Sequence, residues 1–107
     1  MKHVKPYINN INIENIENIN YNVNDYVLIS TKDLTNDDIN KIKMSYNTDY
    51  ITGKIIKISN LNGANTYKCE FIYGTTFHMY RYELLRKLTP KEIEQYELEK
   101  STYIFNI

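Results

Sequence analysis

Cys69 and His78 have the clearest capacity for covalent chemistry in this sequence. A thiolate beside an imidazole is a nucleophile with its general base. However, alternation of apolar and polar residues puts Cys69 on the inward face of one predicted strand. The same alternation puts His78 on the outward face of the next strand. We therefore interpret Cys69 as a buried structural residue and predict that the protein is not an enzyme.

Metal and phosphate chemistry need characteristic spacings. His3 and His78 are far apart, and there is no H-x-x-H, C-x-x-C or carboxylate cluster with ligand spacing. The three glycines form no phosphate-binding loop. The sequence therefore predicts no metal, no cofactor and no small-molecule substrate.

Basic residues gather in the segment from Ile51 to Leu88, which has six Lys or Arg against two Glu, while both ends of the chain are acidic. Tyr80 or Tyr82 beside Arg81 could stack on bases. The alternative is an ordinary solvated face, and the zero net charge of the chain gives no global attraction to nucleic acid. The candidate nucleic-acid contacts are Lys54, Lys57, Arg81, Tyr82, Arg86 and Lys87.

The N-terminal segment, residues 1–23, alternates Asn and Ile with neither helical nor strand spacing throughout. We interpret it as an arm whose isoleucines dock on a partner or on the chain's own domain, because free tails are normally poor in such residues. A short helix over residues 13–19 and a weakly ordered tail are the alternatives. The predicted anchors are Ile11, Ile13, Ile16 and Ile19.

The elements that must position these residues begin with a strand at Tyr26–Ser30 and a helix at Asn36–Met44, capped by Thr35 and Asp38. A second strand, 51–59, contains Gly53, and a turn cluster follows at 60–65. Period-two alternation then predicts a strand over 67–73.

Gly74 predicts a tight turn before a strand at 76–81, a 3₁₀ turn over Arg81–Leu84 and a closing strand at Leu85–Leu88. In this register, seven side chains are predicted to form the core: Val27, Ile29, Ile55, Tyr67, Cys69, Phe71 and Leu85.

The last segment, residues 89–107, starts an acidic helix with Thr89 as cap, Pro90 in the first turn and Glu92 completing a capping box. Ile93, Tyr96 and Leu98 are predicted to face the sheet. The apolar ending "TYIFNI" predicts a further strand or a tail that pairs with a partner.

The segment from Asn24 to Leu88 resembles the SH3-like barrels, and among them the Tudor and related domains. The resemblance is carried by "DYVLI", "TGKIIKI" and "YKCEFIYGTTFHMYRYELLRKL". It implies a mainly β protein: a small SH3-like barrel at 24–88 with a helical insertion at 36–44, an arm and a C-terminal helix. The Tudor likeness also implies an aromatic cage for methylated Lys or Arg built from Tyr46, Tyr50 and Tyr73. The alternative is that these tyrosines pack in the core and at its rim.

The ending of the chain also looks like that of small phage and large-DNA-virus proteins. We predict a non-enzymatic interaction module, a viral or phage accessory or structural protein that binds a protein partner or a second copy of itself. A nucleic-acid-binding barrel is the alternative. Since no apolar run approaches the ~20 residues of a membrane helix and the N-terminus lacks a signal-peptide plan, we expect the host cytoplasm or a virion, without secretion or membrane contact.

Overall fold

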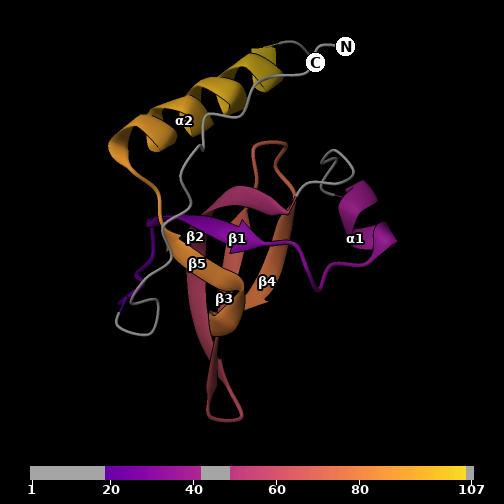
Figure 1. Cartoon of the computed structure of the whole chain (residues 1–107), viewed down its shortest axis with the longest axis vertical. Coiled ribbons are helices and arrows are strands. Elements are labelled where there is room, and N and C mark those ends of the chain that lie inside the picture. The colour runs from indigo at the N-terminus through magenta and orange to yellow at the C-terminus, as the bar shows by residue number, and fades with distance from the viewer. Residues whose placement is uncertain (1–18, 42–48, 106–107) are drawn as a thin grey trace.

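The computed structural model describes residues 19–41 and 49–105, and it confirms a mainly β fold. Five antiparallel strands form one sheet, which a C-terminal helix partly covers (Figure 1). In chain order the elements are β1 (Tyr26–Ser30), α1 (Asn36–Lys41), β2 (Tyr50–Leu61), β3 (Ala64–Glu70), β4 (Thr76–Tyr80), the 3₁₀ helix η2 (Arg81–Glu83), β5 (Leu84–Lys87) and α2 (Pro90–Phe105).

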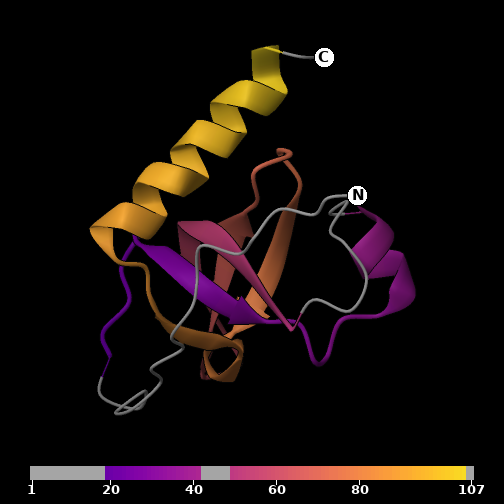
Figure 2. The same cartoon turned by 45° about the horizontal axis from the view of Figure 1, so that its top comes forward.

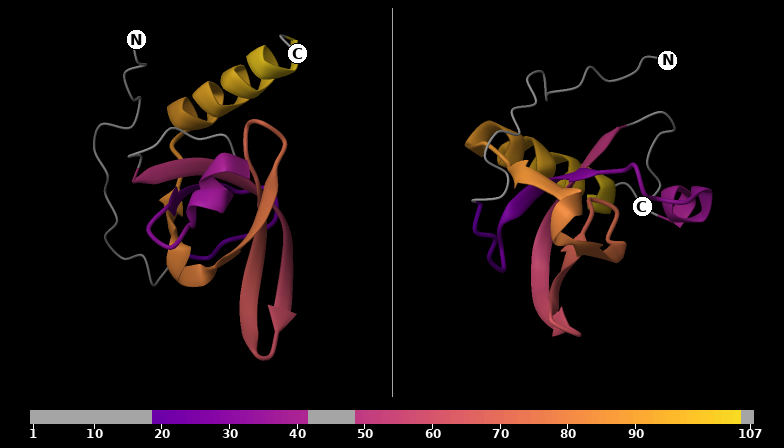
Figure 3. Two further views of the ribbon diagram at one scale, coloured as in Figure 1. Left: turned by 90° about the vertical axis from the view of Figure 1, so that its right-hand side faces the viewer. Right: turned by 60° about the horizontal axis from the view of Figure 1, so that its bottom comes forward.

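The sheet must curl, because its two edge strands are joined by a very short link. The strand order is β4-β3-β2-β1-β5, so β4 and β5 stand at opposite edges. In a flat sheet they would be about 19 Å apart, at roughly 4.8 Å per neighbouring pair. Only η2 joins them, and a 3₁₀ helix advances about 2 Å per residue. The sheet therefore bends into a barrel-like shape, with the β2–β3 hairpin projecting beyond it (Figure 3).

Alternating residues of the strands fill the inside of this curved sheet. The main cluster comprises Tyr21, Val27, Ile29, Ile55, Tyr67, Cys69, Phe71, Met79 and Leu84. Six of the seven predicted core residues are among them. Two core side chains approach the backbone closely at Gly53, which favours glycine there. A Cβ at this position would lie 3.1 Å from the Ile29 Cδ1 atom and 3.3 Å from the Phe71 Cε1 atom.

The seventh core prediction, Leu85, is wrong. Leu84 is fully buried and Leu85 is only half-buried. The 3₁₀ helix ends at Glu83, one residue earlier than predicted, so β5 already begins at Leu84. A bulge then lets Leu84 pair with Ile29, while Arg86 pairs with Leu28. The alternation of the strand is consequently displaced by one residue.

Local capping signals set the start of both α-helices. Thr35 and Asp38 exchange hydrogen bonds at the start of α1, as do Thr89 and Glu92 at the start of α2. The predicted end of the first helix, 42–44, lies outside the described residues. The strand predicted in "TYIFNI" is wrong, because α2 continues to Phe105. Tyr103 on the helix makes an edge contact with Tyr73, 4.8 Å between ring centroids, and such packing overrides the strand preference of β-branched residues.

α2 packs on the outer face of the sheet, near the residues of β1 and β3 (Figures 1 and 2). Tyr96 is fully buried, its ring lies 5.4 Å from that of Tyr26, and its hydroxyl donates to the Glu70 carbonyl. Lys100 forms an ion pair with the Glu70 carboxylate at 2.9 Å. Leu98 is 59% exposed, so its predicted orientation is wrong: two residues from Tyr96, it is turned by about 200° around the helix.

Candidate docking site

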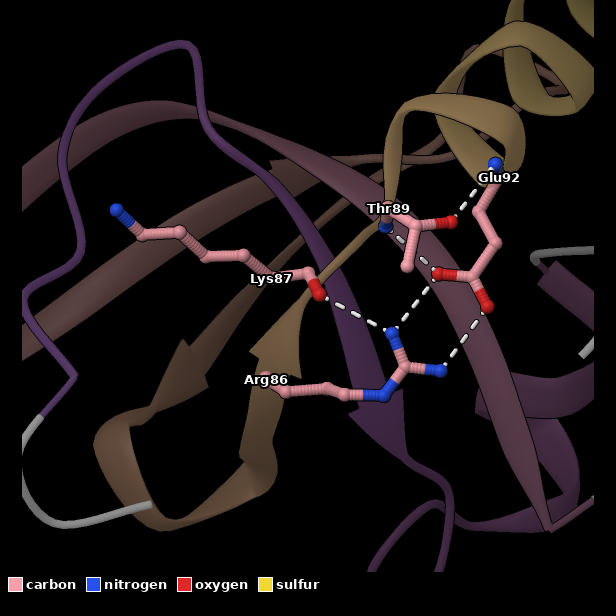
Figure 4. A network of polar contacts seen from close by, with 4 residues as sticks. All are labelled: Arg86, Lys87, Thr89 and Glu92. Carbon is pink, nitrogen blue, oxygen red and sulfur yellow. Dashed lines mark hydrogen bonds and ion pairs between the residues drawn. The ribbon is translucent and has the colours of Figure 1, made fainter. Parts of the chain in front are cut away.

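Three of the basic residues that were predicted to contact nucleic acid interact with other side chains of the protein. Arg86 is held by a bidentate ion pair with Glu92, at 2.8 and 3.0 Å, and both side chains are nearly buried (Figure 4). This pairing lowers the pKa of the Glu92 carboxyl and raises that of the Arg86 guanidinium. Lys87 lies 3.3 Å from the Asp25 carboxylate, and the ammonium of Lys54 lies over the Tyr26 ring at 5.3 Å. Arg86 therefore joins β5 to the start of α2.

Arg81 is the fourth basic candidate, and it binds residues 19 and 21. Its guanidinium donates to the Ile19 carbonyl at 2.8 Å and lies 4.8 Å from the centre of the Tyr21 ring. Tyr21 is buried, and its hydroxyl donates to the Leu84 carbonyl. Ile19 is half-buried and packs against the core. The other predicted anchors of the arm, Ile11, Ile13 and Ile16, lie outside the described residues.

Two exposed tyrosines flank Arg81 and stack on each other. The rings of Tyr80 and Tyr82 are nearly parallel, at an angle of 6° with centroids 5.9 Å apart, and they are 48% and 65% exposed. The turn that brings them together is fixed by Glu83, whose carboxylate accepts a hydrogen bond from the Tyr80 amide at 2.8 Å. Desolvation and the carboxylates of Glu83 and Asp33 raise the pKa of the Tyr82 hydroxyl. The surroundings of Tyr82 are therefore acidic.

An open pocket of about 670 Å³ lies beside this tyrosine pair. Residues 19–20, part of β3, the end of β4 and η2 form its walls. Its lining residues are Ile19, Asn20, Ala64, Asn65, Tyr67, Tyr80, Arg81 and Tyr82. Ala64 and Asn65 reach it because β3 extends beyond the end of β4, where Thr66 is the last residue paired with Tyr80. We call this feature, pocket plus stacked pair, the tyrosine pocket.

Part of this pocket is predicted by the sequence. Ile19, Arg81 and Tyr82 were predicted as site residues, but for two different ligands, and the structure brings them together. Ala64 and Asn65 were missed, since their turn-like surroundings in the sequence give no sign that they extend β3 beyond the end of β4. The exposed Tyr80 at the outward position of a strand was the available signal.

Two of the three tyrosines of the expected aromatic cage, Tyr50 and Tyr73, lie in the described residues. The ring of Tyr73 packs against Tyr103 of α2, and the half-buried Tyr50 lies in β2 opposite Ser30. Tyr46 lies outside the described residues. The rings of Tyr50 and Tyr73 make no contact with each other.

Cys69 and His78 stand on opposite faces of the sheet. Cys69 is buried inside the curved sheet, and burial raises the pKa of its thiol to about 12. His78 is exposed on the outer face of β4. The thiol therefore stays protonated near neutral pH and is out of reach of this imidazole.

Within residues 19–41 and 49–105, no group of three or more His, Cys, Asp or Glu side chains is arranged to hold a metal ion. No helix in the same residues is long and apolar enough to cross a membrane. Comparison with protein-family models, curated proteins and solved structures found no match for the chain. The geometry of the tyrosine pocket is therefore the main guide to function.

Proposed function

We propose that the chain is a non-enzymatic binding module that docks a protein segment in the tyrosine pocket. The observation that carries the proposal is the stacked, exposed pair of Tyr80 and Tyr82 beside an open pocket. Tyrosines supply a large rigid contact surface at a low cost in side-chain entropy, and they are enriched at interfaces.

The hairpin tip adds apolar surface to the same region. Leu61, which pairs with Ala64 at the end of the hairpin, is 59% exposed. Exposed apolar side chains that adjoin a pocket are typical of interaction sites, whereas isolated ones are ordinary surface residues. A flexible protein segment could place one side chain in the pocket and lie along Leu61. A second copy of the chain is an equally suitable protein partner.

A viral or phage accessory or virion role is supported by the Asn- and Ile-rich composition and by the look of the chain's ending. The host cytoplasm or a virion is the corresponding proposed location. The SH3-like resemblance is supported by the small curved antiparallel sheet and its 3₁₀ link, and it is part of this proposal.

The test is selection of ligands from a random peptide display library on the full chain. Peptides that bind should lose at least about tenfold in affinity when Tyr82→Ser removes the exposed ring, as expected for a residue at the centre of an interface. The matched control is Leu98→Ser, a residue of similar exposure on the solvent-facing side of α2. Self-association that Tyr82→Ser abolishes, measured by light scattering, would support the second-copy form.

Two outcomes would overturn the proposal. One is that selection yields no binder and the chain stays monomeric. The other is that Tyr82→Ser lowers the affinity for the selected peptides no more than Leu98→Ser does.

A further inference from the structure

A row of three basic side chains crosses the outer face of β2, β3 and β4. Lys57 pairs with Lys68, and Lys68 pairs with His78, so the three residues are direct cross-strand neighbours. Each lies next to inward-facing residues and therefore points outward. Lys57 and His78 are exposed and Lys68 is half-buried. We call this feature the basic row.

The basic row is not neutralised by the described part of the chain. Among those residues, none of its three members forms an ion pair with a carboxylate. Glu70 is two residues from Lys68 on β3, and its carboxylate already forms an ion pair with Lys100. Lys57 and Lys68 place like charges directly opposite each other, which destabilises a sheet. An anion that lies between these two lysines would relieve this repulsion.

A stacking surface adjoins the row on the side away from α2. Tyr80 is two residues after His78, on the same face of β4, and its ring is 48% exposed. Neighbouring strands are about 4.8 Å apart, so the row is roughly 10 Å long. Two lysines and a histidine in a row, with an aromatic ring at the side, match a flexible strand of phosphates with unstacked bases. A duplex, whose bases are stacked inside, would leave the ring without a partner.

We infer that this outer face binds single-stranded nucleic acid, with backbone phosphates on Lys57, Lys68 and His78 and a base on Tyr80. Recognition is of backbone and stacking, hence independent of sequence. The site shares Tyr80 with the tyrosine pocket, but Lys57, Lys68 and His78 do not line that pocket. The lysine variants therefore test this inference separately from peptide docking, which Tyr82→Ser tests.

The experiment measures the fluorescence anisotropy of a labelled oligothymidylate titrated with the full chain over a range of salt concentrations. The double variant Lys57→Gln/Lys68→Gln is compared with Lys32→Gln/Lys91→Gln. The second pair removes the same charge from exposed lysines on the β1–α1 loop and on α2. Each phosphate contact contributes about 0.7 to the slope of log affinity against log salt for single strands. Loss of both contacts should flatten the slope by about 1.4, and the control pair should leave it unchanged.

Tyr80→Ser should weaken oligothymidylate binding at least about fivefold without changing the salt slope, since stacking involves no counterion release. Tyr80→Phe keeps the ring and should bind like the wild type. Circular dichroism melting confirms that each variant is folded. The inference is overturned if the two double variants bind equally well. It is also overturned if polyglutamate competes as strongly as unlabelled oligothymidylate, because the face would then recognise charge alone.

Discussion

Tyr26 and Tyr96 form one tyrosine pair on the outer side of the sheet, and Tyr80 and Tyr82 form another. The first pair meets edge to face at 75° beneath α2, and the second is stacked at 6° in the open. In the first pair both hydroxyls are bonded, that of Tyr26 to the Glu97 carboxylate and that of Tyr96 to the Glu70 carbonyl. The bond to Glu97 raises the pKa of Tyr26 to about 12, and burial raises that of Tyr96. The same residue type thus stabilises one end of the sheet and forms an exposed surface at the other.

The strongest test of this contrast is Tyr96→Ala. Removing a fully buried aromatic ring should lower the free energy of unfolding by about 3–5 kcal/mol, because a cavity is left under α2. Tyr96→Phe, which loses only the hydrogen bond to Glu70, should cost about 1 kcal/mol. Urea denaturation followed by circular dichroism measures both values. Equal effects of the two variants would mean that the ring does not hold the helix on the sheet.

The next largest effect is expected at the junction of β5 and α2. Glu92→Gln removes the anion from the nearly buried Arg86 guanidinium and weakens the cap of α2. Hydrogen bonds to charged groups contribute about 1.5–3 kcal/mol, so unfolding should become easier by about that amount. Glu94→Gln, an exposed change in the same turn of α2, is the matched control and should be nearly silent.

The same ion pair predicts that the stability of the fold falls at acidic pH. The folded-state pKa of Glu92 is lowered, with its hydrogen bonds to Arg86 as the largest cause. A lowered pKa means that the pair's stabilising effect is fully present above the ordinary glutamate pKa of about 4.3. The effect is lost as pH falls from there through the lowered value. Thermal melting from pH 7 to pH 2 should therefore show a steeper loss for the wild type than for Glu92→Gln, and parallel curves would contradict this assignment.

The smallest effect on stability is expected at the exposed tyrosine pair. Tyr82→Ser should change the free energy of unfolding by no more than about 0.5 kcal/mol, since the ring is 65% exposed. Urea denaturation under the conditions used for Tyr96→Ala gives the direct comparison. A cost close to that of Tyr96→Ala would show that the stacked pair is a structural element, and the contrast between the two ends would disappear.

Much of the architecture could be predicted from local patterns. The strand at Tyr26–Ser30, the turn at Gly74 and the capping box of Thr89 and Glu92 depend on residues close together in sequence, and all three are confirmed. The end of α2 was missed because Tyr73, which packs against Tyr103, lies 30 residues away. Local preference for a strand in "TYIF" gave no warning of that contact.

The proposed binding surfaces were harder to predict, because they depend on the register of the strands. A bulge between Ile55 and Lys57 decides that Lys57 faces the same side as Lys68. Without that displacement of one residue, the basic row would not exist. Conversely, Arg86 looked as available as Lys57 in the sequence, yet the bidentate pair with Glu92 withdraws it from the surface.

β1 is an interior strand of the sheet, and its position has a consequence for biosynthesis. β1 bonds to β2 on one side and to β5 on the other, although Leu28 and Arg86 are separated by most of the domain. Closing so long a loop has an entropic cost that local contacts cannot offset early, and such topologies fold slowly. On the ribosome, β1 emerges first and must wait with one edge unpaired until Lys87 has left the exit tunnel. The nascent chain is therefore most vulnerable to aggregation between these two events.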